Sequence, residues 1–171
     1  MEKKLRILIL EDNLSDVDLI DRTLTRSGIN FESSVATGKE EFIETLDQQT
    51  FDIILSDHSL PQFSSVEALE EVIKRDLDVN FILVTGTVSE EFAVEMMQKG
   101  VDDYILKNNL FRLPTAIIKA LDKRKIKKEK ILAEEALRES EVQYRILFEQ
   151  ASDGIFISNQ KGEFLDANKE A

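Results

Sequence analysis

The stretch that decides the fold is Phe51-Asp52-Ile53-Ile54-Leu55-Ser56-Asp57, residues 51–57, an apolar and β-branched run that ends in a carboxylate. An earlier run, Leu5-Arg6-Ile7-Leu8-Ile9-Leu10, ends in the acidic pair Glu11-Asp12. Short apolar runs of this kind are typical of strands in a parallel sheet that is buried on both faces. Because open sheets of this type bind their ligands at the carboxyl ends of the strands, we expect the three carboxylates to converge there.

Carboxylates that converge repel one another unless a cation lies between them. Mg²⁺ is the usual hard cation for a site with oxygen ligands. Two later runs add further polar groups, because residues 80–84 lead into Thr85 and residues 103–106 lead into Lys107. A hydroxyl and an ammonium group beside carboxylates and a metal form a site for a phosphoryl group, with Asp57 as the candidate nucleophile.

Segments with a helical period separate these runs, and each carries one apolar stripe. They cover residues 15–27, 39–47, 65–75 and 89–99. Strands that alternate with single helices require right-handed crossovers, a parallel sheet and helices on both of its faces. The chain is therefore expected to have an α/β fold.

The polar residues at the strand ends, in this order, resemble the response-regulator receiver domain of two-component signalling. The resemblance covers about residues 1–122 and rests on Glu11, Asp12, Asp57, Thr85, Tyr104 and Lys107. It implies a doubly wound, flavodoxin-like sheet of five parallel strands in the order 2-1-3-4-5. It also implies that a histidine kinase or phosphotransfer protein supplies a phosphoryl group to Asp57.

The same resemblance implies a role for each site residue. The carboxylates of Glu11, Asp12 and Asp57 and the backbone carbonyl of Ser59 would bind Mg²⁺. Lys107 would pair with one phosphoryl oxygen and Thr85 with another, and Tyr104 would turn inward as a conformational switch. Self-phosphorylation and autodephosphorylation that depend on Mg²⁺ would be the chain's own chemistry.

Two positions depart from the family pattern. Ser65 stands where the family usually has glycine, so a residue with a Cβ must adopt that backbone conformation or the loop must shift. Asn108 stands where the family usually has a proline that follows the lysine through a cis peptide bond. Because Lys107 has no evident substitute, we predict that the Lys107–Asn108 bond is also cis, despite a cost of about 2.5 to 4 kcal/mol.

The pattern changes after Pro114, because residues 115–150 contain neither glycine nor proline. We predict one continuous helix from about Leu113 to about Gln150, with residues 123–140 as a linker. Residues 141–171 resemble the beginning of a PAS domain, in which a helix leads into two strands joined by a turn at 159–162. A homodimer through the linker is one alternative, although its seam is interrupted by charges at Lys125, Lys128 and Glu135.

Composition excludes several classes of function. A formal charge of −12 argues against nonspecific binding of nucleic acid. Cysteine is absent, which excludes thiolate metal sites and fits a cytoplasmic protein, and no run of 18 apolar residues predicts a membrane span. The only histidine, His58, directly follows Asp57 in an expected loop, so the chain lacks the phosphoacceptor helix of a histidine kinase.

Two other functions compete with the phosphoacceptor. The first is a docking module that keeps the fold but works without phosphorylation. The second is a phosphohydrolase of the haloacid-dehalogenase type, which usually has a second Asp two residues after its nucleophile. That position is Ser59 here, so turnover of an external substrate is not expected.

Overall fold

A five-stranded parallel sheet organises the first part of the chain in the computed structural model, which describes residues 4–87 and 89–171. The strands lie in the order β2-β1-β3-β6-β7, which in chain order is the predicted 2-1-3-4-5. Their bounds are β1 Leu5–Leu10, β2 Phe31–Ala36, β3 Ile53–Ser56, β6 Asn80–Thr85 and β7 Asp103–Leu106. The register pairs Leu10 with Ser56 and Ser56 with Leu83, so the central strands end at one edge.

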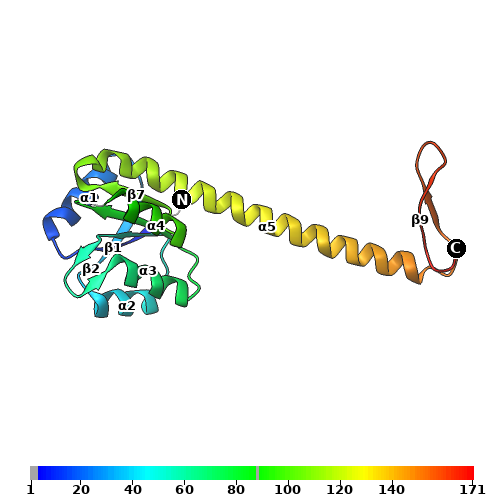
Figure 1. The fold of residues 1–171 in the computed structure, drawn as a ribbon, viewed down its shortest axis with the longest axis horizontal. Helices are drawn as coiled ribbons and strands as arrows, with labels where there is room; N and C mark the ends of the chain where they lie inside the picture. Colours follow the sequence, from blue (N-terminus) through cyan, green and yellow to red (C-terminus); the bar gives the residue numbers. More distant parts are fainter. Residues whose placement is uncertain (1–3, 88) are drawn as a thin grey trace. The chain divides into compact units, whose positions relative to one another are not determined.

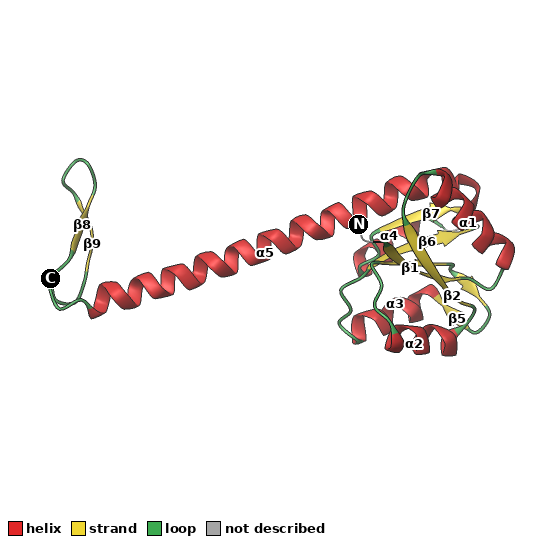
Figure 2. Cartoon of the chain, turned by 180° about the vertical axis from the view of Figure 1, so that it is seen from behind, coloured by secondary structure: helices red, strands yellow, loops and turns green. Residues whose placement is uncertain are grey.

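Helices cover both faces of the sheet (Figures 1 and 2). On one face α2 (Lys39–Gln48), α3 (Ser65–Lys74) and α4 (Glu90–Lys99) enclose a core that contains Phe42 and Phe81. On the other face α1 (Leu14–Arg26) and the beginning of α5 (Leu113–Gln150) pack against the opposite side chains of the same strands. The alternation of the strand residues between two cores explains why the central strands β1, β3 and β6 are mostly apolar.

The helices begin and end at residues that satisfy their free backbone groups. Asn13 caps α1 by accepting a hydrogen bond from Ser15 N (3.0 Å). Ser64 and Glu67 form a reciprocal capping box at the start of α3. Gly100 ends α4 with φ +115°, a left-handed conformation that strongly favours glycine.

A short hairpin, β4 (Ser59–Leu60) and β5 (Phe63–Ser64), follows Asp57 and was not predicted. Its turn places Gln62 at φ +62°, the left-handed region. Ser65 is fully buried as the first residue of α3 and is not among the described non-glycine residues with positive φ. Ser65 therefore does not adopt a left-handed backbone conformation. The positive φ in this loop is at Gln62, in the turn of the hairpin.

The long helix is confirmed, because α5 runs unbroken from Leu113 to Gln150 after the 3₁₀ helix η1 (Lys107–Arg112). The chain divides into two units between Arg124 and Lys125. The second unit ends in an antiparallel hairpin of β8 (Phe156–Ser158) and β9 (Phe164–Ala167), the two strands expected there. Across the described residues, every helix is too short or too polar to cross a membrane.

Candidate functional site

Three carboxylates meet at the carboxyl edge of the sheet. Glu11 follows β1 and is 1% exposed, and Asp57 follows β3 and is 8% exposed. Asp12 is exposed, yet one oxygen from each of the three residues lies within 4.8 Å of the others. The backbone holds this geometry, because Asp57 N donates a hydrogen bond to Leu10 O (2.9 Å).

Lys107 extends its ammonium group into the same site from the end of β7. Its Nζ lies 2.6 Å from Asp16 Oδ2, 2.7 Å from Glu11 Oε2 and 3.0 Å from Asp57 Oδ2. The predicted cis bond between Lys107 and Asn108 is wrong, because the described backbone contains no cis peptide bond. The 3₁₀ turn that begins at Lys107 directs the lysine to Asp57 through an ordinary trans bond.

Burial and charge act in opposite directions at these groups. Burial raises the pKa of Glu11, while Lys107 and the backbone N–H of Asn13 lower it by a smaller amount. Burial lowers the pKa of Lys107, but its contacts with Asp16, Glu11 and Asp57 outweigh this, so the net shift is upward. Lys107 is therefore positively charged at neutral pH and acts as the internal counter-ion of the cluster.

The two oxygens of Asp57 have different neighbours. Oδ2 faces Lys107, whereas Oδ1 accepts hydrogen bonds from the backbone N–H groups of His58 (2.6 Å) and Ser59 (3.4 Å). These contacts fix the orientation of the carboxylate with respect to the hairpin. Ser59 is exposed at the first position of β4, two residues after Asp57.

Thr85 and Tyr104 come from the next two strands of the sheet. Thr85 is 1% exposed at the end of β6, and its Oγ1 donates a hydrogen bond to Thr87 O (3.4 Å). Tyr104 is half-buried in β7 and packs against the core beneath α4. Its ring lines a cavity of about 500 Å³, together with residues of α4 that include Val94 and Met97.

His58 is half-buried, although we expected it to be exposed in a loop. Its Nδ1 lies 2.9 Å from Ser65 Oγ, and its ring centre lies 4.1 Å from that of Phe92. The β4–β5 hairpin brings the residue between the beginnings of α3 and α4, where it is a packing residue. The Asp57 carboxylate contacts its backbone.

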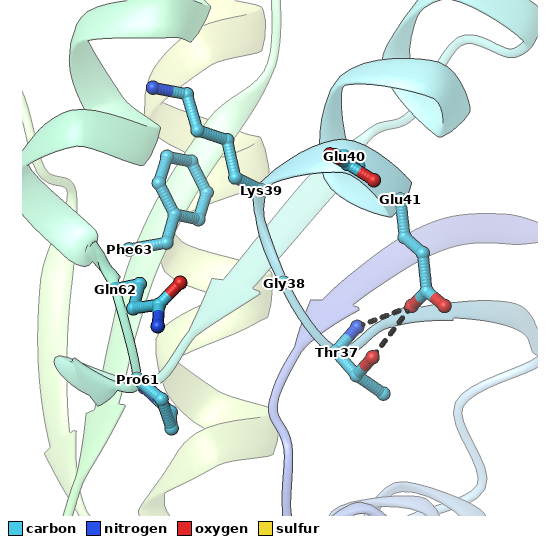
Figure 3. A pocket seen from close by; sticks show the side chains of 8 residues that line it. All are labelled: Thr37, Gly38, Lys39, Glu40, Glu41, Pro61, Gln62 and Phe63. Carbon is cyan, nitrogen blue, oxygen red and sulfur yellow. Dashed lines mark hydrogen bonds between the residues drawn. The ribbon is translucent and has the colours of Figure 1, made fainter.

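A separate pocket lies between the β2–α2 loop and the β4–β5 hairpin (Figure 3). Its volume is about 430 Å³, and Lys39 lies over the Phe63 ring at 5.8 Å from the ring centre. Glu41 accepts hydrogen bonds from the backbone N–H and the hydroxyl of Thr37, both at 2.8 Å. Since none of its lining residues belongs to the acidic cluster, this pocket is a different feature from the site at Asp57.

The acidic cluster fits a hard divalent cation. Its donors are carboxylate oxygens, which Mg²⁺ prefers. Glu11 Oε2 is buried and has an ion-pair contact with Lys107, but the angle is not that of a hydrogen bond, so its lone pairs remain available. Among the described residues, this is a group of carboxylates whose distances suit one metal ion.

Sequence reasoning missed Asp16, although its contact with Lys107 is the shortest of the three. Asp16 is the third residue of α1 and follows the N-cap Asn13 at the spacing of an ordinary capping acid. An acid in a first helical turn is explained by the helix dipole alone, so the pattern carries no sign of a second role.

The chain is similar in sequence to known regulatory proteins. Chemotaxis protein CheY of Thermotoga maritima is 24% identical over 118 residues, which cover 69% of this chain and 95% of that protein. The alkaline phosphatase synthesis transcriptional regulatory protein PhoP of Bacillus subtilis is 29% identical over 72% of this chain and half of its own length. The chain also matches other curated regulatory proteins. Apart from the chemotaxis protein, the matches cover only 21–61% of each relative's own length.

A solved structure and a family model extend the comparison. The CheY-like receiver domain protein from Methanospirillum hungatei has a TM-score of 0.64 and 29% identity, and the match covers 73% of this chain and 99% of that one. The sequence model of the response regulator receiver domain matches residues 7–119, which is more than half of the chain. These residues contain the whole five-stranded sheet except the first two positions of β1, together with the acidic cluster and Lys107. The chain therefore belongs to the response regulator receiver domain family.

Proposed function

We propose that Asp57 accepts a phosphoryl group from a histidine kinase or phosphotransfer protein, and that the receiver comprises residues 1–122. The observation that carries this proposal is the Lys107 ammonium, which lies 3.0 Å from Asp57 Oδ2 beside two further carboxylates. A carboxylate that served only the fold would need no such arrangement at the carboxyl edge of a sheet. The family places its ligand site at this edge.

The chemistry is attack of an Asp57 carboxylate oxygen on phosphorus, which forms an acyl phosphate and releases the donor's leaving group. Transfer of this kind depends on positioning and on neutralising charge at the phosphoryl oxygens. Lys107 supplies one positive charge, and the buried hydroxyl of Thr85 would donate a hydrogen bond. Tyr104 would then turn inward toward the space beside Thr85 as the switch.

Glu11, Asp12 and Asp57, with the carbonyl of Ser59, would hold Mg²⁺, the cofactor of the proposed site. The cation would supply positive charge to the phosphoryl oxygens. Its removal would leave three carboxylates facing an incoming anion with Lys107 as their only fully charged partner among the described residues. Both phosphorylation and loss of the phosphoryl group would then depend on the cation.

The proposed output runs through α5. Residues 123–140 would form the linker, and residues 141–171 would be the beginning of a PAS domain that follows a cytoplasmic receiver. Asn168 supports an ordered start, because its buried amide donates hydrogen bonds to Phe148 O (3.0 Å) and Asp153 O (2.9 Å).

Exposed apolar side chains on α5, which include Ile126 and Leu137, support a homodimer through the linker. Truncation after Asp122 should then give a monomer by light scattering.

The test of the phosphoacceptor is labelling with acetyl phosphate. The chain should gain one phosphoryl group by intact mass, Asp57→Asn should gain none, and a chelator should abolish labelling. The exposed Asp18→Asn variant is a matched control, because Asp18 pairs only with Arg22 in the described contacts. Undiminished labelling of Asp57→Asn would reject the proposal.

The alternative is a docking module that works without phosphorylation. It would retain the fold and bind its partner equally well with Asp57 replaced by Asn. The pairing of Lys107 with Asp57 favours the phosphoacceptor, because a docking surface has no need of this buried ion pair. An unlabelled chain in the acetyl phosphate experiment would favour the docking module.

A further inference from the structure

Asp16 is a fourth carboxylate of the site and lies outside the cluster that fits a metal. Its side chain is 27% exposed in the first turn of α1, and its Oδ2 also accepts a hydrogen bond from Asn13 Nδ2 (3.3 Å). Lys107 Nζ lies closer to Asp16 (2.6 Å) than to Asp57 (3.0 Å). Helix α1 therefore contacts Lys107 directly, through the carboxylate of Asp16.

The three partners of Lys107 have different fates when a divalent cation binds. Glu11 and Asp57 are both members of the cluster that fits the cation, whereas Asp16 is not. The Lys107 ammonium donates hydrogen bonds to Asp16 and Asp57 and forms an ion pair with Glu11. A cation that binds Glu11 and Asp57 shares two of these partners with Lys107, and Asp16 is the one that it does not share.

We propose that Asp16 is a positioning residue, which holds Lys107 beside the acceptor when a divalent cation occupies the cluster. This inference rests on the proposed function, because it concerns the lysine of the phosphoacceptor site. Asp16 offsets the repulsion between the lysine and the cation by giving the ammonium group an alternative partner. Without Asp16, Lys107 would either stay on Glu11 and Asp57 and compete with the cation, or lose all of its carboxylate partners.

The charge balance gives the direction of the effect. Glu11, Asp12, Asp16 and Asp57 together carry one negative charge more than Lys107 and a divalent cation can neutralise. Removal of the Asp16 charge can weaken the cation's binding by two routes, direct attraction and the contact with Lys107, and the proposal assigns the effect to the second. Only the second route requires the lysine, so the two can be separated in a double-mutant cycle.

The experiment is isothermal titration calorimetry, in which Mg²⁺ is added to the 171-residue chain without any phosphodonor. Asp16→Asn should weaken Mg²⁺ binding by about five- to tenfold, the effect of one unit charge within a partly screened site. In a Lys107→Met background the same substitution should change the affinity by less than about twofold. Asp18→Asn, which removes the same charge from the same helix, should leave the affinity unchanged.

Each other result overturns the proposal. Equal losses in the two backgrounds would mean that Asp16 acts on the cation through space, and no loss in either would mean that it acts on neither. A loss in Asp18→Asn as large as in Asp16→Asn would assign the effect to net charge. Failure of the unsubstituted chain to bind Mg²⁺ at millimolar concentrations would also overturn it. Because no phosphoryl transfer is measured, an unphosphorylated Asp57 would reject the proposed function and leave this result intact.

A folding control accompanies the titration. Asparagine keeps an oxygen that can accept from Asn13, so Asp16→Asn should have the same urea midpoint as the unsubstituted chain. Asp16→Glu should restore Mg²⁺ affinity at least in part, because it returns the charge on a longer side chain. A merely structural role for Asp16 would change the urea midpoint and would not depend on Lys107.

Discussion

Replacement of Lys107 by methionine should destabilise the receiver at pH 7 in the absence of a divalent cation. The substitution leaves Glu11 and Asp57 buried without their counter-ion, and loss of one partner from a buried ion pair costs about 3 to 5 kcal/mol. The Lys107 side chain is 19% exposed and that of Asp16 is 27% exposed, so water reaches part of the site. We therefore expect a loss of about 2 to 3 kcal/mol in the free energy of unfolding.

The loss should depend on pH in a defined direction. The pKa of Glu11 is raised in the folded chain by burial, and Lys107 limits that rise. A raised carboxyl pKa means that ionisation of Glu11 costs folding free energy, and that this cost disappears as the pH falls through the folded-state pKa. Without Lys107 the pKa of Glu11 rises further, so the deficit of the variant should shrink between pH 7 and pH 5.

The assay is urea unfolding at both pH values, with and without saturating Mg²⁺. Bound Mg²⁺ supplies the missing positive charge, so it should reduce the deficit of Lys107→Met. Lys99→Met is the matched control, because Lys99 is 44% exposed and pairs with Glu95 on the surface. It should leave the free energy of unfolding nearly unchanged, because surface ion pairs contribute little. A deficit that is equal at pH 5 and pH 7, or equal to that of the control, would refute the reasoning.

Three further substitutions test the packing that positions the site. Ser64→Ala removes the capping box with Glu67 and should lower the free energy of unfolding in urea by about 1 kcal/mol. Ser64→Thr should keep most of this stabilisation, because threonine can also cap the helix. Asn80→Ala removes a buried amide that donates to Asp102 (3.0 Å) and should cost about 1 to 3 kcal/mol, with no change in acetyl phosphate labelling per folded molecule. Phe42→Ala leaves a void in the core beneath α2 and should cost about 3 to 5 kcal/mol, and a smaller loss in calorimetric unfolding would show that the core collapses around it.

Much of the fold could be predicted, because its main determinants are local and periodic. The central strands of the sheet are buried on both faces, so runs such as residues 7–10 and 81–84 are apolar throughout. A helical period between two such runs permits few topologies. The same applies to α5, because residues 115–150 contain neither glycine nor proline to break the helix.

What could not be predicted depends on contacts between distant residues. The approach of Lys107 to Asp16 joins positions 91 residues apart, and no spacing in the sequence indicates it. The expected cis bond failed for a related reason, because the 3₁₀ turn after β7 directs the lysine without it. The burial of His58 likewise follows from a hairpin of two-residue strands, which are too short to show any periodicity.

Because α5 is continuous, its length determines the rotation of one end of the helix relative to the other. An α-helix turns by about 100° for each residue, so one residue inserted between Lys125 and Gln150 would rotate all that follows by that angle. Seven inserted residues would nearly restore the original facing and add only about 10 Å. Any output that senses the facing of this helix should therefore tolerate insertions of seven residues, which leave a net rotation of about 20°. It should fail with insertions of two or five residues, which leave net rotations of about 160° and about 140°.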